Sequence, residues 1–485
     1  MERRCVRALD TTGLDRPGKS ALREVLRLCP MYPTSAIVAL EALEALNEQN
    51  AIKRPSQSAS VDSLYGESVH LLSKEISSNS SSPMSLYITA LLLLAIELLQ
   101  RRRQNGLKHG IAAVQSLSTS TNQQPGSRSI GHLGRIYDLQ CMLYSEGVRL
   151  PTLEAADPPV FSIHEEVDWR QVECRSIEAL HYAQACIARV YHDSIAADTG
   201  MHESAISGCT QRLVKWRECL QRQLTVIKDA SSRSILLILQ NLFILTLLQV
   251  KCLFVTYEMQ WDAHRDDYDA IVQSADEFFA ACATASDDNC SSFTLQVGVI
   301  PPLHMVALKC RHLDLRKRAI AHLESAGCEG PFIGPQLAAM ARSCMELERQ
   351  MTSDGVASTD ASANQLSSKL PEEHLRVANC TLLEHNGEAN GSNRSSPFTG
   401  WTTVRFLRRR KPGTVTRARV LTSTSFRSAP DLGQLQGEEL DPEMWEEWTE
   451  KILFGKEVDR KDQLSRTAKL AGIATSKTPT PRNEQ

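Results

Sequence analysis

Hydrophobic residues recur at helical spacing along most of the chain, whereas the alternation typical of strands is scarce. The pattern is clearest in residues 293–325, which predict two short antiparallel helices joined at a tight corner. Pro301 and Pro302 suit a helix start, because a proline in the first turn loses no N–H that the helix needs. In the second helix we expect Asp314 to cap the N-terminus. Its cationic residues should take the wetter face: Arg316, Lys317, Arg318 and His322.

Further helix-period segments predict the same class of structure elsewhere in the chain. They cover residues 34–48, 86–99, 107–114, 177–191, 213–227, 235–260 and 270–282. Residues 86–99 are apolar on every face, which is typical of a helix surrounded by others. We therefore predict an all-α fold, an irregular bundle of antiparallel helix pairs.

Changes in composition predict the domain boundaries. We expect an N-terminal segment over 1–29, a compact helical domain over 30–350, a linker over 351–399 and a tail over 400–485. Within the domain, the serine-rich stretch at about 50–83 should be a flexible linker with one turn around 69–76, because it offers little apolar surface to bury.

Three of these segments resemble a known family. Residues 88–117, the tryptophan-containing residues 212–224 and residues 297–323 are similar, in this order, to the regulatory domain of fungal-specific transcription factors, which follows a binuclear zinc cluster. The similarity extends over roughly residues 30–350. It implies a regulatory helical domain that controls the activity of an attached DNA-binding module.

The cysteines separate this chain from that family. None of the 14 cysteines forms a C-x2-C pair, so the zinc cluster cannot be built from this sequence. We expect no cofactor in this chain, because zinc would be bound only by an N-terminal cluster that this sequence does not contain. We also expect no sequence-specific DNA binding by the chain alone. The cysteines, including Cys310 beside Arg311, are predicted to be free, and several to be buried as small hydrophobes in a reducing compartment.

Neither net charge nor hydropathy indicates binding to nucleic acid or to a membrane. The net charge of −3 gives no overall attraction to nucleic acid or to an anionic membrane. Residues 235–255 are long and apolar enough to cross a bilayer. Polar residues along this stretch favour a buried helix of a soluble core instead: Gln240, Asn241, Gln249 and Lys251. We expect no membrane partner.

Catalytic motifs are almost absent from the sequence. Residues 13–20 match the phosphate-binding pattern G-x-x-x-x-G-K-S, but residues 3–12 do not form the buried strand that a P-loop needs. We interpret the match as chance and predict that the protein is not an enzyme. A P-loop nucleotide-binding protein remains a remote alternative.

The tail contains two candidate functional segments. A basic run, Arg408, Arg409, Arg410 and Lys411, is typical of an importin-read nuclear signal, although a solvated loop or an edge strand accounts for it equally well. Further on, a short helix is predicted after Asp441, with Trp445, Trp448 and Ile452 on one face among many glutamates. This face would dock on its own domain or contact a partner as an activation-type helix.

The sequence and the resemblance together imply a nuclear transcription regulator. It would act through partners, namely the transcription machinery or another DNA-binding regulator, or through a bound metabolite. The alternative is a helical protein-interaction scaffold without a transcriptional role, and the alternative location is the cytoplasm. The oligomeric state is left open.

Overall fold

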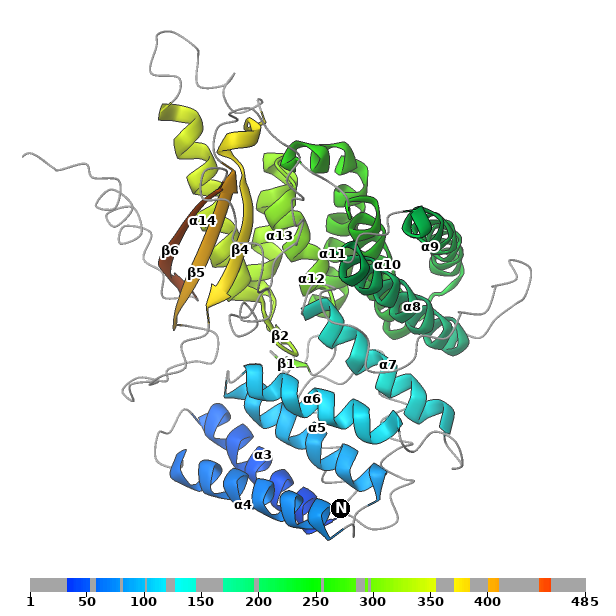
Figure 1. Cartoon of the computed structure of the whole chain (residues 1–485), viewed down its shortest axis with the longest axis vertical. Coiled ribbons are helices and arrows are strands. Elements are labelled where there is room, and N and C mark those ends of the chain that lie inside the picture. The colour runs from blue at the N-terminus through cyan, green and yellow to red at the C-terminus, as the bar shows by residue number, and fades with distance from the viewer. Residues whose placement is uncertain are drawn as a thin grey trace, which may run out of the picture.

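The structure, a computed structural model, is built mainly of helices (Figure 1). It describes residues 33–52, 58–78, 82–100, 103–118, 127–144, 169–195, 200–253, 257–284, 293–294, 298–354, 370–383, 400–409 and 445–454. In these ranges it has twelve α-helices and two three-stranded sheets, one of which has strands of only two residues. The predicted all-α class is confirmed.

Two helix pairs form the N-terminal part of the molecule, at the bottom of Figure 1. The first pairs α3 (Thr34–Ile52) with α4 (Ser58–Ser77), and the second pairs α5 (Pro83–Leu99) with α6 (Arg103–Ser118). The N-cap residue of α5 is Ser82, whose hydroxyl accepts the N–H of Ser85. As predicted, α5 is buried along almost its whole length.

Helix α4 corrects the expectation of a flexible linker at about 50–83. Its apolar residues Val61, Leu64 and Leu72 pack against the core, and its serines lie mostly on the opposite, exposed face. The buried Ser68 donates a hydrogen bond to the carbonyl of Ser35 in α3 at 2.8 Å. The linker prediction was wrong because it was based on the serine content of this stretch. A helix that packs on another helix needs only one narrow apolar stripe, and its other positions can be serine.

Helices α7 (Ser127–Tyr144) and α8 (Trp169–Ile195) run parallel, which departs from the predicted antiparallel pairing. Three side-chain contacts between them advance along both helices in the same direction. They are His132–Glu173 at 3.7 Å, Arg135–Glu178 at 3.5 Å and Asp138–His181 at 2.9 Å. In an antiparallel pair the residue numbers on one helix would fall as those on the other rise.

The core helix is α10 (Ala230–Lys251), which packs against α8, α9 (Gly200–Val226) and α11 (Arg265–Thr284). It ends before residue 260, the predicted limit, and a 3₁₀ helix, η2 (Glu258–His264), precedes α11. Among the described residues this is the one helix long and apolar enough to span a membrane, but 83% of its apolar window is buried inside the protein. That burial supports the interpretation as a core helix.

The predicted two-helix corner is present as α12 (Ile300–Lys309) and α13 (Leu313–Ser325). The carboxylate of Glu329 accepts the N–H groups of Gly298, Val299 and Ile300 at 2.8–3.1 Å, which satisfies the N-terminus of α12. Asp314 lies in the first turn of α13 but is not its cap, since the N-cap position belongs to His312.

A small sheet and a long helix follow the corner. Strands β2 (Cys328–Glu329) and β3 (Phe332–Ile333) form a hairpin, and β1 (Phe293–Thr294) pairs parallel with β2. The hairpin turn uses Gly330 at a φ of 55°, where a side chain would collide with Gln140 of α7. Helix α14 (Gly334–Asp354) then packs against both α12 and α13.

The C-terminal elements return to the helical body. After η3 (Glu373–Leu375), the antiparallel strands β4 (Val377–Leu383), β5 (Gly400–Arg409) and β6 (Trp445–Phe454) form a sheet beside α14, with β5 in the centre (Figure 1). Part of the expected linker over 351–399 is therefore packed structure. The predicted end of the compact domain at residue 350 is too early.

Candidate functional site

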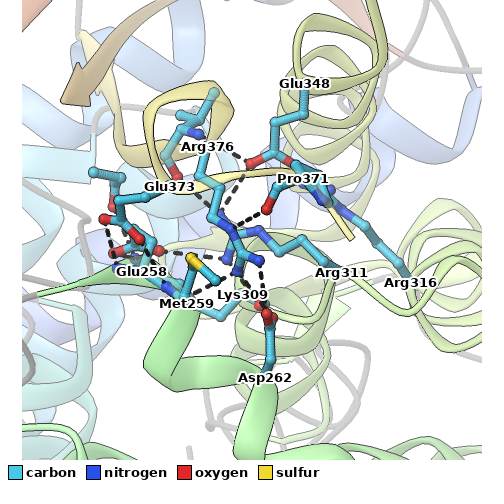
Figure 2. Close-up of polar contacts among 12 residues, drawn as sticks. Glu258, Met259, Asp262, Lys309, Arg311, Arg316, Glu348, Pro371, Glu373 and Arg376 are labelled. Carbon is cyan, nitrogen blue, oxygen red and sulfur yellow. Dashed lines mark hydrogen bonds and ion pairs between the residues drawn. The ribbon is translucent and has the colours of Figure 1, made fainter. Parts of the chain in front are cut away.

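Eight charged residues gather where η2, the α12–α13 corner, α14 and the η3–β4 segment meet (Figure 2). Four are acidic and four are basic, so their formal charges cancel. We call them the buried charge cluster: Glu258, Asp262, Lys309, Arg311, Arg316, Glu348, Glu373 and Arg376.

Glu348 of α14 lies at the centre of one half of the cluster. Its carboxylate accepts a hydrogen bond from Arg311 Nη2 at 3.0 Å, a second from Arg316, and a third from the backbone N–H of Val377 at 2.9 Å. Burial alone would raise the pKa of Glu348, but the two guanidinium groups outweigh it and hold that pKa at about 2. The same contacts raise the pKa of Arg311, so both groups remain charged at neutral pH.

Lys309 ends helix α12 inside the protein, with only 4% of its surface exposed. Its ammonium donates to both carboxylate oxygens of Glu258, at 2.9 and 3.0 Å, and to the carbonyl of Ala378 at 2.8 Å. The ring of Trp261 lies 5.4 Å away, within range of a cation–π contact. A buried ammonium is thereby fully supplied with acceptors.

Arg376 fastens the C-terminal segment to η2. Its guanidinium donates to both oxygens of Asp262, at 2.9 and 2.6 Å, and its Nε donates to the carbonyl of Pro371 at 2.8 Å. In return, the carboxylate of Glu373 accepts the N–H groups of Glu258 and Met259, both at 2.9 Å, at the start of η2 (Figure 2). The C-terminal segment is thus bound to the helical body through one cation, Arg376, and one anion, Glu373.

The cluster is suited to holding elements together. Its charged groups bind one another and nearby carbonyls, and Glu348 and Arg311 do not change protonation near pH 7. An arrangement of this kind fixes the geometry of the elements that contribute its side chains. We therefore assign it the role of joining the C-terminal sheet to the α12–α14 body.

One member of the cluster lies elsewhere than its sequence pattern predicts, and other members carry no sequence signal. Arg316 was expected on the wet face of α13, but it is 3% exposed because Glu348 of α14 pairs with it. No sequence signal singled out Glu348 or Arg376. A sequence signal lies in Lys309 and Arg311, which flank the apolar position Cys310, because cations next to residues that become buried need carboxylate partners. The sequence does not show which acids these partners are.

The predicted nuclear signal lies at the end of β5. Arg408 is in register with Glu446 of β6, and Arg409 with Trp445. The other two residues of the run, Arg410 and Lys411, lie outside the described residues. The alternative prediction of an edge strand is wrong for Arg408 and Arg409, because β5 is the central strand of its sheet.

The predicted acidic and aromatic helix is instead strand β6, which corrects the expected shared face of Trp445, Trp448 and Ile452. A strand has a side-chain period of two and not the 3.6 of a helix, so the spacing from which one shared face was predicted does not apply. Ile452 is 5% exposed, and its register partner on β5, Thr402, is also buried. The pairing with β5, distant in sequence, decides the local structure.

Other candidate chemistry from the sequence has no counterpart in the described residues or falls outside them. Residues 13–20, the P-loop-like match, lie outside. Within the described ranges no group of three or more histidine, cysteine, aspartate and glutamate side chains could hold a metal ion. Burial raises the pKa of Cys310 to about 11, as expected of an inert buried thiol.

The fold and the cluster define an all-α protein whose C-terminal sheet is tied to the helical body by buried ion pairs. Comparisons with known protein families, with curated proteins and with solved structures found no match. The likeness to fungal-specific transcription factors therefore depends on the three sequence segments alone and stays a prediction.

Proposed function

We propose that this chain is a transcription regulator whose helical domain works like the regulatory half of a fungal zinc-cluster transcription factor. It acts through partner proteins or a bound metabolite, because the sequence contains no cysteine spacing from which a DNA-reading zinc cluster can form. Its partners are the transcription machinery or another regulator that binds DNA itself.

The observation that supports this proposal best is the placement of the three family-like segments. They correspond to the α5–α6 pair, to the part of α9 around Trp216, and to the α12–α13 corner. Buried residues of all three belong to one hydrophobic core, among them Leu92, Trp216 and Leu303. The three segments that resemble the family thus contribute to the same hydrophobic core. A regulatory domain of this class is expected to have one such core.

The charges of the body support the need for a DNA-binding partner. Lys309, Arg311, Arg316 and Arg376 are all engaged with carboxylates in the interior, so they are not offered to phosphate groups. Specific reading of DNA also needs side chains held at base edges by a rigid element, together with cations along the backbone. Residence at promoters is therefore expected to depend on a second protein.

The second candidate function is a protein-interaction scaffold with no transcriptional role. One observation favours it: the acidic and aromatic segment is strand β6, hydrogen-bonded to β5 over ten register pairs. An activation-type helix offered to a partner groove would have to leave this sheet first.

Nuclear entry tests the proposal against the scaffold. We expect the change of Arg408, Arg409, Arg410 and Lys411 to alanine to move a tagged full-length protein from the nucleus to the cytoplasm. The matched control is Lys215→Ala with Lys228→Ala, which removes cations that are exposed on the helical body. Exclusion of the unaltered protein from the nucleus would reject the transcriptional role and leave the scaffold.

A further inference from the structure

Two cysteines face each other between α8 and α9. Cys186 of α8 and Cys209 of α9 lie side by side on two consecutive helices, close enough for their thiol groups to share a hydrogen bond. The helices run antiparallel here, since the guanidinium of Arg212, about one turn after Cys209, lies 5.3 Å from the ring of Tyr182, one turn before Cys186.

The two thiols differ in exposure. Cys209 is only 3% exposed, whereas Cys186 is partly open to solvent. Arg189 and Arg212, both exposed, lie close enough to influence the charge of Cys186. An accessible sulfur beside cations and next to a second, sheltered sulfur is the arrangement that a peroxide-reactive thiol and its resolving partner require.

We propose that Cys186 and Cys209 form a redox-responsive dithiol, in which Cys186 reacts with a hydroperoxide and Cys209 resolves the product into a disulfide that links α8 to α9.

The surroundings of Cys186 explain why it is the attacking sulfur. The hydrogen bond from Cys209 lowers the pKa of Cys186 most, burial opposes this effect, and Tyr182 and the two arginines lower the pKa further. Burial raises the pKa of other described thiols, among them that of Cys252, to about 12, and that of Cys219. The thiolate is the reactive form, so the environment selects Cys186 from among them.

The chemistry balances with a peroxide as the oxidant. The Cys186 thiolate attacks one peroxide oxygen, the O–O bond breaks, and a sulfenic acid forms as hydroxide or an alkoxide leaves and takes a proton from water. The Cys209 sulfur then attacks the Cys186 sulfur, the S–O bond breaks, and water leaves with the Cys209 proton. A cellular dithiol returns both cysteines to the reduced state.

The consequence for the protein is a covalent link between two helices that in the reduced state meet through non-covalent contacts such as that of Arg212 with Tyr182. Transient disulfides of this kind fit a reducing compartment, where they form under oxidant and are removed afterwards. Because α9 also contains Trp216, which stacks on Phe243 of α10 at 6.1 Å, the link would fix the position of α9 on the core.

The first test uses the reduced full-length protein. It is treated with limiting hydrogen peroxide, remaining thiols are alkylated, and disulfides are mapped by mass spectrometry of the digest. We expect one predominant cross-link, between Cys186 and Cys209, that dithiothreitol removes. Cross-links spread over other cysteines, or none at all, would overturn the proposal without the need for any variant.

Variants then separate the two roles. Cys209→Ser should leave a sulfenic acid at Cys186 that dimedone traps, and Cys186→Ser should abolish both the trap and the cross-link. Cys219→Ser, another buried position on α9, is the matched control and should retain the cross-link. Loss of the cross-link in this control would show that it depends on the general packing of α9 and would count against a dedicated pair.

A rate measurement tests the electrostatic environment. The reaction rate of Cys186 should reach half its maximum at a pH below that of an ordinary thiol, about 8.5. Arg212→Gln should slow the reaction at pH 7 several-fold, whereas Arg222→Gln, an exposed arginine further along α9, should not. An ordinary midpoint with no effect of Arg212 would overturn the assignment of Cys186 as the attacking thiol.

Discussion

At the scale of single residues, the buried charge cluster depends on geometry that only the folded chain provides. Arg376 is fully buried and meets both oxygens of Asp262, while Glu348 meets Arg311 and Arg316. Removing one member of such a pair leaves the charge of its partner buried and uncompensated. The loss of folding free energy is then larger than the net stabilisation that the pair provides.

The change of Arg376 to alanine should lower the free energy of unfolding by about 3 kcal/mol, because Asp262 and the carbonyl of Pro371 lose their donor. Urea denaturation of the full chain measures this. The control is Arg349→Ala, whose exposed pair with Glu346 should contribute no more than about 1 kcal/mol. Equal losses in both variants would show that the Arg376 contact does not hold the sheet.

Acid should weaken the cluster through Glu348. Its folded pKa of about 2 lies below the ordinary value of 4.5, so the stabilisation is complete above pH 4.5 and is lost as the pH falls toward 2. The amount is about 3 kcal/mol, from roughly 1.4 kcal/mol for each pKa unit. In Glu348→Gln the unfolding free energy should start lower at pH 6 and approach that of the unaltered protein at pH 2. Parallel curves would contradict the low pKa.

At the scale of elements, what the sequence predicts depends on whether an element is defined by its own residues. Helices α5, α10, α12 and α13 follow from apolar spacing, which local residues alone provide. Strand β6 does not, because Trp445, Trp448 and Ile452 satisfy a helical period equally well until β5 is known to lie beside them. The direction of α8 against α7 likewise comes from pairs 40 residues or more apart in the chain.

The parallel α7–α8 pair should respond to base through His132. Burial would lower the pKa of His132, but hydrogen bonds with Cys174 and Glu173 raise it to about 9, above the ordinary 6.5. The stabilisation is therefore complete below pH 6.5 and is lost as the pH rises through 9, by about 3 kcal/mol. Melting temperatures between pH 6 and 9.5 should fall more steeply for the unaltered protein than for His132→Gln. The same slope in both would contradict a charged His132.

At the scale of the whole molecule, the sequence predicts the all-α class. It does not predict that the C-terminal strands pack against the helical body. The polar residues 351–399 signal the end of a compact domain by composition, yet η3 and β4 bring Glu373 and Arg376 back to η2. The acids that receive Arg311 and Arg376 are 37 and 114 residues away in the chain. No pattern in the sequence can pair charges over such separations.

We have proposed that this chain regulates transcription through partners and not through DNA contacts of its own. The most direct measurement fuses the full-length protein to an unrelated DNA-binding module in fungal cells and reads a reporter that carries the site of that module. We expect the fusion to change reporter expression several-fold, in either direction, relative to the module alone. Expression equal to that of the module alone, with the fusion present in the nucleus at the same level, would contradict it.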